Sequence, residues 1–315
     1  MQIYRQIADP PDALRGGALA IGNFDGVHRG HAQLVERLVQ RAEACGGPAV
    51  VFTFDPHPVR LLRPEQSPPP LTWTERKAEL LSDLGVDAVI AYPTDMALLR
   101  LSAREFFELI VVKTLAARAL VEGPNFFFGR GREGNVELLA EFCQGVGLSL
   151  DVVRPNEREG EMISSSRIRS LIGDHGDVAT AMTMLTSPYR LRGIVTHGAG
   201  RGAAMGTPTA NLEGIDTLLP AHGVYAAVAR VKGGVWPAAV NIGPNPTFDD
   251  QSTKVEAHLI DCEESLYGKP LELDFLDRLR EVRRFDSKEQ LIAQIESDVQ
   301  RTRQVFRQTR EPSKQ

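Results

Sequence analysis

The feature that most constrains the fold of this 315-residue chain is a change of pattern near residue 186. Before that point, short apolar runs alternate with amphipathic stretches long enough for helices. After it, extended runs follow one another with only Gly, Pro and Asn turns between them. Strands that alternate with helices predict a parallel, doubly wound α/β sheet, whereas extended runs joined by turns predict a small antiparallel β-barrel. We therefore predict two domains, residues 1–186 and residues 187–315.

Five apolar runs of the first half are predicted to be buried strands, at residues 18–22, 49–54, 87–93, 118–123 and 148–153. Amphipathic segments between them predict helices, at residues 31–44, 74–85, 102–115 and 135–147. A helical pattern continues over residues 166–185. The second half predicts strands within residues 189–198, 223–243, 254–261 and 269–279. A last helix, residues 287–306, is predicted to close one face of the barrel.

Composition narrows the class of protein. The chain is 42% hydrophobic and 24% charged, as soluble globular proteins are. Its formal net charge of −5 gives no bulk attraction to nucleic acid or to an anionic membrane. Three dispersed cysteines indicate neither a disulfide framework nor a zinc site, and the N-terminus lacks the apolar core of a signal peptide. We predict a cytoplasmic protein without nucleic-acid or membrane partners; its oligomeric state is not indicated.

The most specific motif is GNFDGVHRGH, residues 22–31, between the first predicted strand and the first predicted helix. In a doubly wound sheet this turn lies at the edge where ligands bind, and the free N–H groups of a helix start attract anions. His28 and His31 are three residues apart and share one face of the helix start. The motif is neither a Walker loop nor a dinucleotide fingerprint. It predicts donors to phosphate oxygens, although one histidine could instead cap the helix and the other bind metal or solvent.

Three further motifs follow in order: TFDPHP at residues 53–58, GPNFFFGRGREG at 123–134 and ISSSRIR at 163–169. With GNFDGVHRGH, they resemble the bacterial bifunctional riboflavin kinase/FMN adenylyltransferase (FAD synthetase) family, over essentially the whole chain. The resemblance implies that the histidines act on ATP phosphates. It implies that nucleotide and flavin are bound by Gly22, Asn23, Phe24, Asp25, Gly30, Asn125, Ser164, Ser165 and Arg169. The serines could equally be an N-cap run, and for His57 a turn is favoured over a direct role.

The second half carries a glycine loop and a small polar cluster, GAGRGAAMGTPTANL, at residues 198–212. Gly200 and Arg201 are predicted to bind nucleotide, although the loop is one residue shorter than in the family and lacks a common basic residue. Thr209 and Asn211 lie two residues apart on an extended segment and therefore face the same way. Their oxygens are a plausible pair of Mg²⁺ ligands beside a nucleotide phosphate.

Downstream, NIGPNPTF, KVEAHLID and LYGKPLEL resemble the remaining signatures of riboflavin kinases. Alternation in KVEAHLI puts Val255, Ala257 and Leu259 on one face and Glu256 and His258 on the other. The resemblance assigns Glu256 as the general base that takes the proton of the ribityl 5′-hydroxyl. The alternative is a glutamate on the solvated face of a strand.

The resemblance implies two reactions, with ATP, riboflavin, FMN and FAD as substrates and products and Mg²⁺ as cofactor. The barrel would phosphorylate riboflavin to FMN, and the first domain would adenylylate FMN to FAD and release pyrophosphate. Two alternatives stay open: a related nucleotidyltransferase with another acceptor and a regulatory flavin-binding barrel, or a flavin-binding module without turnover. A pure binder has no need of the histidine pair together with Thr209, Asn211 and Glu256, so we favour the enzyme.

Overall fold

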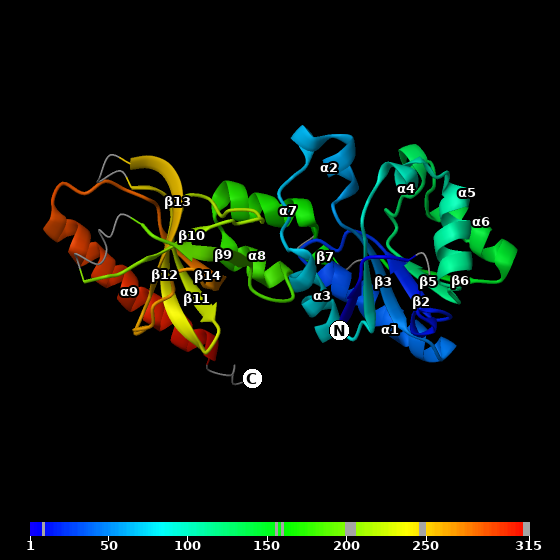
Figure 1. Ribbon diagram of the computed structural model, residues 1–315, viewed down its shortest axis with the longest axis horizontal. Helices are drawn as coiled ribbons and strands as arrows, with labels where there is room; N and C mark the ends of the chain where they lie inside the picture. The colour runs from blue at the N-terminus through cyan, green and yellow to red at the C-terminus, as the bar shows by residue number, and fades with distance from the viewer. Residues whose placement is uncertain (8–9, 155–156, 159–160, 199–205, 246–249, 311–315) are drawn as a thin grey trace. The chain divides into compact units, whose positions relative to one another are not determined.

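The computed structural model describes residues 1–7, 10–154, 157–158, 161–198, 206–245 and 250–310. The chain forms two compact units, one of Met1–Pro68 with Thr72–Ser164 and one of Pro69–Leu71 with Ser165–Gln315 (Figure 1). The boundary predicted near residue 186 divides the chain into two functional domains, residues 1–186 and 187–315. This division stays a prediction. No helix among the described residues is both long and apolar enough to span a membrane.

The first unit is built on a parallel sheet, as predicted for an α/β fold. Its strands are β1 (Gln2–Tyr4), β2 (Ala18–Ile21), β3 (Ala49–Phe54), β4 (Ala88–Tyr92), β5 (Ala119–Glu122) and β6 (Ser149–Val152). Their order is β1-β4-β3-β2-β5-β6, and every neighbouring pair is parallel. All five predicted strands are present. β1 was not predicted, because three residues in a polar context are too few to show a pattern.

Helices cover both faces of this sheet (Figure 1). They are α1 (Arg29–Cys45), α2 (Pro58–Leu62), α3 (Thr74–Asp83), α4 (Met96–Arg100), α5 (Ala103–Phe106), the π-helix η3 (Phe107–Thr114) and α6 (Val136–Val146). One apolar layer joins the sheet to α1 and α3, and the other joins it to α5, η3 and α6. Short 3₁₀ segments are η1 (Asp12–Leu14), η2 (Pro64–Gln66) and η4 (Arg130–Arg132), and β7 (Glu157–Arg158) pairs with β8 (Glu161–Met162). The four predicted helices of this half are confirmed.

The second unit begins with a broken helical segment rather than one continuous helix. It consists of α7 (Ser165–Arg169), the π-helix η5 (Ser170–His175) and α8 (Val178–Met184). Gly176 takes a left-handed conformation, with φ of 68°, and ends η5. The Asp177 side chain then accepts a hydrogen bond from the Thr180 N–H and caps α8. The predicted helical pattern over residues 166–185 is therefore correct in type but interrupted.

The remaining strands form a closed barrel, as predicted. They are β9 (Arg190–Thr196), β10 (Ala210–Glu213), β11 (Gly223–Val231), β12 (Gly234–Asn245), β13 (Asp250–Leu259) and β14 (Pro270–Arg280), in the order β10-β13-β12-β11-β14-β9. Every neighbouring pair is antiparallel. Inside the barrel, Tyr225 and Phe275 meet edge to face with ring centroids 5.4 Å apart. Strand pairing alone closes the cylinder.

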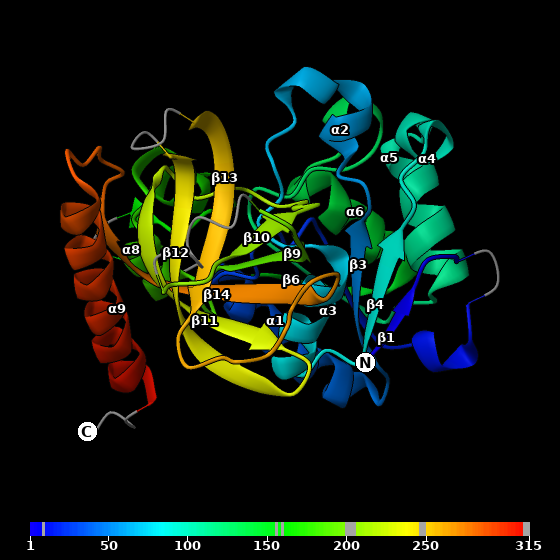
Figure 2. The same ribbon diagram turned by 60° about the vertical axis from the view of Figure 1, so that its left-hand side comes forward.

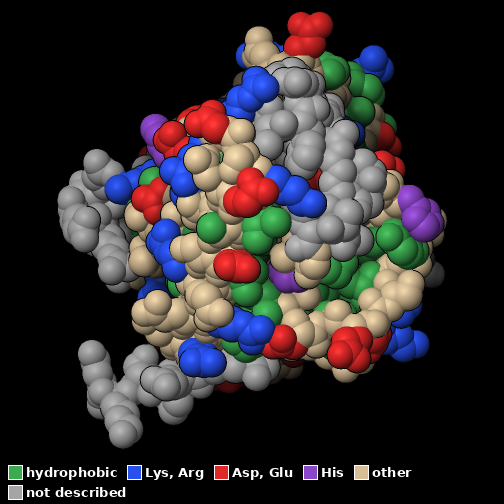
Figure 3. All heavy atoms as spheres, turned by 90° about the vertical axis from the view of Figure 1, so that its left-hand side faces the viewer, with side chains coloured by type: hydrophobic (Ala, Val, Ile, Leu, Met, Phe, Trp, Pro, Cys, Tyr) green, Lys and Arg blue, Asp and Glu red, His purple; other side chains and the backbone are tan. Residues whose placement is uncertain are grey.

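The predicted last helix is α9 (Lys288–Arg310), which lies along the outside of the barrel against β11, β12 and β14 (Figure 2). Val305 packs against Val224, Ala226 and Leu279, which are buried under it. Figure 3 shows this side of the barrel unit, where the coloured acidic and basic side chains are interspersed. The helix therefore covers an apolar strip of a barrel that the strands already close.

Candidate active sites

The strand order of the first unit locates a ligand-binding edge at β2. The chain passes from β2 to β3 and β4 on one side, and β5 then pairs with β2 on the other side. Ligands of doubly wound sheets bind at the carboxyl ends of the strands where the order reverses in this way. The histidine turn, residues 22–31, leaves β2 at this edge, and the aromatic loop, residues 123–134, leaves β5 beside it. The structure thus brings together two motifs that are about a hundred residues apart in sequence.

His28 and His31 are held by a reciprocal cap at the start of α1. The Nδ1 atom of His28 accepts from the His31 N–H, and the Nδ1 atom of His31 accepts from the His28 N–H, both at 3.3 Å. Their rings are stacked, with centroids 3.6 Å apart and planes 14° apart. An Nδ1 atom that accepts a backbone N–H carries no proton, so each neutral ring holds its proton on Nε2. The cap therefore fixes both histidines as Nε2–H donors.

The electrostatic surroundings keep this pair neutral in the ligand-free protein. Burial lowers the pKa of His28 to about 4, against a smaller opposing effect of Asp25. Burial, His28 and Lys77 lower the pKa of His31 well below its usual value. A bound polyphosphate would add negative charge beside both rings and raise both pKa values. A further proton would have to bind Nδ1 and break the cap, so in the ligand-free protein the pair acts as two neutral Nε2–H donors.

These low pKa values predict acid sensitivity of the first unit. Below pH 6.5 the unfolded chain protonates its histidines while folded His28 stays neutral, so the unfolded state binds more protons and stability falls with pH. For His28 the loss is about 2 kcal/mol between pH 6.5 and pH 5. Replacing His28 by Asn and His31 by Gln should remove this loss. Urea denaturation at pH 7 and pH 5 measures it, followed by tryptophan fluorescence in proteins that also carry Trp236→Phe, so that only Trp73 reports. An unchanged pH dependence in the double variant would contradict the assignment.

Below the histidines, the turn is anchored by buried polar contacts. The Asp25 carboxylate accepts from both the N–H and the hydroxyl of Thr72, each at 3.1 Å. Phe24, with a left-handed φ of 47°, buries its ring 5.1 Å from that of His31. The Oδ1 atom of Asn23 is buried without a hydrogen-bond partner among the described residues. Asn23 therefore has an acceptor in place for a ligand, whereas Asp25 and Phe24 hold the turn in shape; ligand contacts of these residues stay predictions.

Sequence reasoning missed Lys77 and Glu122 at this edge, and it gave no role to Thr53, the first residue of the TFDPHP motif. Lys77, on α3, is buried and donates from Nζ to the Thr53 hydroxyl at 3.4 Å. That hydroxyl in turn donates to the Asn23 carbonyl oxygen at 3.2 Å. Glu122, at the end of β5, accepts from the Ile21 N–H at 2.8 Å, and burial raises its pKa well above the usual value. The local sequence pattern does not mark these residues as functional. Only their position at the carboxyl end of a strand, or beside one, indicates a role in the site.

The aromatic loop forms a platform next to β5. The rings of Phe126 and Phe128 stack with centroids 5.4 Å apart, and Phe128 is buried while Phe127 is 46% exposed. The guanidinium of Arg132 lies 4.5 Å from the ring centre of Phe127. Asn125 is exposed at the start of the loop. An exposed aromatic face under a cation is suited to stacking with a planar ring system.

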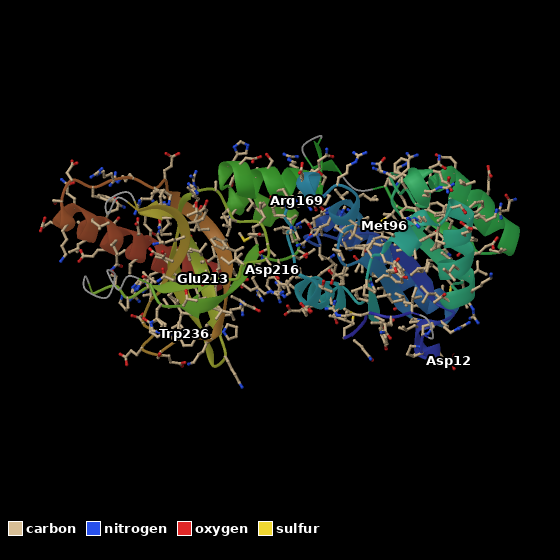
Figure 4. All side chains as sticks on the ribbon, turned by 45° about the horizontal axis from the view of Figure 1, so that its top comes forward. Asp12, Met96, Arg169, Glu213, Asp216 and Trp236 are labelled. Atoms are coloured by element: carbon tan, nitrogen blue, oxygen red, sulfur yellow. The ribbon has the colours of Figure 1, made fainter. Side chains whose placement is uncertain are left out.

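His57, Ser164, Ser165 and Arg169 belong to other segments of the chain. His57 accepts from the Val59 N–H and caps α2, which is the turn role that the sequence favoured. Ser164 ends the first unit, whereas Ser165 and Arg169 belong to α7 of the second unit. The Nε atom of Arg169, labelled in Figure 4, donates to the Pro69 carbonyl oxygen at 3.1 Å. Phosphate binding by Ser164, Ser165 and Arg169 stays a prediction.

A second polar constellation lies on the barrel. Glu256 of β13 is directly opposite Asn211 of β10 on one side and Asn241 of β12 on the other. Residues directly opposite each other point to the same face of a sheet. Val255, Ala257 and Leu259 are buried in the barrel, as predicted, so the three polar residues form a row on its outer face. Thr209 precedes the first residue of β10 and lies two residues before Asn211; its predicted place on the same face stays a prediction. Asn241 was not predicted as a site residue, although its motif was noted.

Gly198 fixes where the Asn211 side chain lies. A Cβ atom added at Gly198 would come within 2.1 Å of Nδ2 of Asn211. Gly200 and Arg201 lie outside the described residues. On the other side of the row, the His258 ring bonds the Pro208 carbonyl oxygen at 2.8 Å through Nδ1 and holds the segment that carries Thr209.

This contact predicts the effect of Gly198→Ala. The methyl group must push the Asn211 amide out of its position. Phosphorylation of riboflavin, the reaction that the sequence resemblance implies for the barrel, should therefore fall at least about tenfold, because misplacement of about 1 Å costs up to 10²-fold. Gly145→Ala on α6, where an added Cβ meets nothing within 4 Å, is the matched control. Initial rates of FMN formation measure the effect. Equal rates for both variants would show that Asn211 need not hold this position.

Comparison with known proteins identifies both halves. The family model described as FAD synthetase matches residues 11–167, and the model described as riboflavin kinase matches residues 185–306. A bifunctional riboflavin kinase/FMN adenylyltransferase of Pseudomonas fluorescens is 35% identical over 95% of this chain and 96% of its own length. The chain belongs to this family. The relative from Listeria monocytogenes is 36% identical over 91% of this chain and 92% of its own.

A solved structure agrees with the bifunctional riboflavin kinase/FMN adenylyltransferase fold. It is the crystal structure of a Streptococcus pneumoniae protein called a macrolide-efflux protein, and it matches with a TM-score of 0.83 and 29% identity. The match covers 96% of this chain and 98% of that one. The name of that protein differs from those of the curated relatives. The family membership of this chain rests on the family models and on the curated relatives.

Proposed function

We propose that the histidine turn and the row on the barrel are the two active sites of this bifunctional enzyme. The barrel site makes FMN from riboflavin, and the site at the carboxyl edge of the parallel sheet makes FAD from FMN. The observation that carries the proposal is that each half, within its own compact unit, assembles a polar constellation suited to one of the two reactions.

In the adenylyl step, a phosphate oxygen of FMN attacks the α-phosphorus of ATP, and the bond to the leaving pyrophosphate breaks. Negative charge shifts to the pyrophosphate oxygens. The Nε2–H groups of His28 and His31, fixed by the reciprocal cap, donate hydrogen bonds to these oxygens, together with the free N–H groups at the start of α1. The Oδ1 atom of Asn23 is an acceptor, so it suits a hydroxyl or amino donor of the substrates rather than their phosphate oxygens. The Phe127 platform orients the flavin or adenine ring. Positioning and charge stabilisation are sufficient without a covalent intermediate.

In the kinase step, the ribityl 5′-hydroxyl attacks the γ-phosphorus of ATP and ADP leaves. Glu256 accepts the hydroxyl proton, and its place between Asn211 and Asn241 keeps the carboxylate on the outer face of the barrel. The oxygens of Thr209 and Asn211 fit Mg²⁺, which prefers a few protein oxygens combined with phosphate oxygens and water. Bound there, Mg²⁺ would neutralise phosphate charge.

The setting of the enzyme follows from its charge and its substrates. We propose that it works in the cytoplasm on the small molecules ATP, riboflavin and FMN. The net charge of −5, and the mixture of acidic and basic side chains on the one face shown in Figure 3, support the absence of a nucleic-acid or membrane partner.

The direct test is to incubate the protein with riboflavin, ATP and Mg²⁺ and to separate the flavins by chromatography. We expect FMN first, then FAD with one equivalent of pyrophosphate, and neither product when Mg²⁺ is withheld. Adenylylation of another acceptor without FAD would favour the nucleotidyltransferase alternative. Riboflavin recovered bound and unchanged would favour a binding module.

A further inference from the structure

Lys77 is a buried cation for which the described part of the chain provides no ion-pair partner. Its side chain is on α3, and the residue is 8% exposed. Its one side-chain hydrogen bond there is the 3.4 Å contact to the Thr53 hydroxyl, which is long for such a bond. A buried charge is costly unless an opposite charge pairs with it. The position of Lys77 therefore requires an explanation.

Asp25 and Asp55 raise the pKa of Lys77 through their charge, but the described residues show no ion pair between either of them and Lys77. The Asp25 carboxylate accepts two hydrogen bonds from Thr72. The Asp55 carboxylate accepts from the Thr74 hydroxyl at 2.6 Å and pairs with Arg5 at 3.0 Å. Both act on Lys77 only at longer range, and burial lowers the Lys77 pKa despite them. The ligand-free protein thus leaves this ammonium group incompletely neutralised.

The place of Lys77 in the fold shows what could complete the pairing. Thr53, which accepts its hydrogen bond, is near the carboxyl end of β3 and bonds the Asn23 carbonyl of the histidine turn. The charge of Lys77 also acts on His31 and lowers its pKa. The ammonium group is therefore at the same edge of the sheet as the histidine pair, linked through the Thr53 hydroxyl to the backbone of the histidine turn. An anion bound by the histidines would lie within reach of its field.

We propose that Lys77 is a further phosphate-binding residue of the adenylyl-transfer site, and that the polyphosphate of ATP, or the pyrophosphate product, is its ion-pair partner. This inference rests on the proposed function of the first unit. The phosphate oxygens of the ligand then provide the ion-pair partner that the Lys77 ammonium group lacks in the described part of the ligand-free protein. Binding is then coupled to relief of an unfavourable buried charge, and the neutral histidines add hydrogen bonds to the same oxygens.

The reverse reaction tests this at one site only. With FAD and pyrophosphate as substrates, a pyrophosphate oxygen attacks the adenylyl phosphorus, the bond to the FMN phosphate breaks, and FMN and ATP form. The barrel takes no part, so the KM for pyrophosphate reports on the first unit of the full-length chain. Lys77→Met keeps the length of the side chain and removes the charge. We expect the KM for pyrophosphate to rise about 10- to 100-fold, as for loss of a hydrogen bond to a charged group.

Stability separates a ligand-binding role from a structural one. If Lys77 is an unpaired charge, Lys77→Met should leave the Tm of the ligand-free protein unchanged or raise it, and should reduce the rise in Tm caused by pyrophosphate. Lys113→Met removes the same charge from an exposed position of the same unit and is the matched control. Thr53→Val removes the hydrogen-bond acceptor of Lys77 and tests whether the lysine merely ties Thr53 to the turn. We expect Lys113→Met to keep a wild-type KM, and Thr53→Val, whose hydroxyl also bonds the histidine turn, to raise the KM much less than Lys77→Met does.

Each outcome decides the proposal. A ligand-free Lys77→Met protein that is destabilised or unfolded would show that Lys77 is structural. So would a Thr53→Val variant whose KM rises as much as that of Lys77→Met, and an unchanged KM in Lys77→Met would also overturn the proposal. A wild-type protein that does not convert FAD and pyrophosphate would refute the proposed function of the first unit instead, which distinguishes the two failures.

Discussion

Replacing His28 and His31 together by alanine is expected to abolish FAD formation while FMN accumulates. The two imidazoles provide the Nε2–H donors for oxygens whose charge grows as pyrophosphate leaves. Removal of one donor of this kind typically costs about 10²–10³ in rate, so loss of both should cost at least about 10³-fold. The barrel belongs to the other compact unit and keeps its own site, so riboflavin should still be phosphorylated.

The same change also removes the cap of α1, which costs about 1 kcal/mol of stability. A second double variant, His28→Asn with His31→Gln, keeps side chains able to form a capping box but lacks the imidazoles. It should lose FAD formation to the same degree with a nearly wild-type Tm. His175→Ala, at an exposed histidine of η5, is the control for loss of a histidine. Chromatography of flavins after a fixed time with riboflavin and ATP measures all three. If either double variant forms FAD at the wild-type yield, the two histidines serve only to cap α1.

Glu256→Gln is expected to slow phosphorylation of riboflavin by about 10²–10⁴-fold, the usual contribution of a general base. Glutamine keeps the size of the side chain and much of its hydrogen bonding with the row between Asn211 and Asn241, but it cannot accept the hydroxyl proton. Riboflavin binding should persist, and supplied FMN should still become FAD. The fall should therefore be in kcat of the kinase step rather than in KM.

Glu213→Gln is the matched control for this change. Glu213 is an exposed glutamate of β10, labelled in Figure 4, and lies two residues from Asn211 on the same face. Glu213 carries the same charge on the same barrel, but it does not belong to the row of Asn211, Glu256 and Asn241. A kinase rate in Glu256→Gln within about threefold of wild type, and equal to that of Glu213→Gln, is too small a change for loss of a base. Glu256 would then be a solvated strand residue.

The sequence was most informative where periodicity and burial coincide. Five parallel strands, the barrel strands other than β10, and α9 were predictable because their apolar residues follow the period of the structure that they form. Alternation in β13 correctly predicted that Val255, Ala257 and Leu259 are buried and that Glu256 is on the opposite face. The interruption at Gly176 was not predicted, because a glycine within a helical pattern can be tolerated or can end the helix.

The sites were predictable only in part, because motifs name residues and not their neighbours. The histidine pair was found from its spacing, but its stacked, reciprocally capped geometry depends on the backbone of the turn. Lys77 and Glu122 look like ordinary members of a helix and a strand, and only the order of the sheet places them at the edge of the site. Asn241 likewise gains meaning only from the register that sets it opposite Glu256.

The central claim is that one chain carries two independent sites that act in sequence. The most direct measurement mixes the His28→Ala/His31→Ala protein with the Glu256→Gln protein and supplies riboflavin, ATP and Mg²⁺. Alone, the first should stop at FMN and the second should barely convert riboflavin. Together, they should form FAD, because FMN released by the intact barrel is adenylylated by the intact histidine site. A mixture that accumulates FMN without FAD, or either variant alone making FAD at the wild-type rate, would contradict the account.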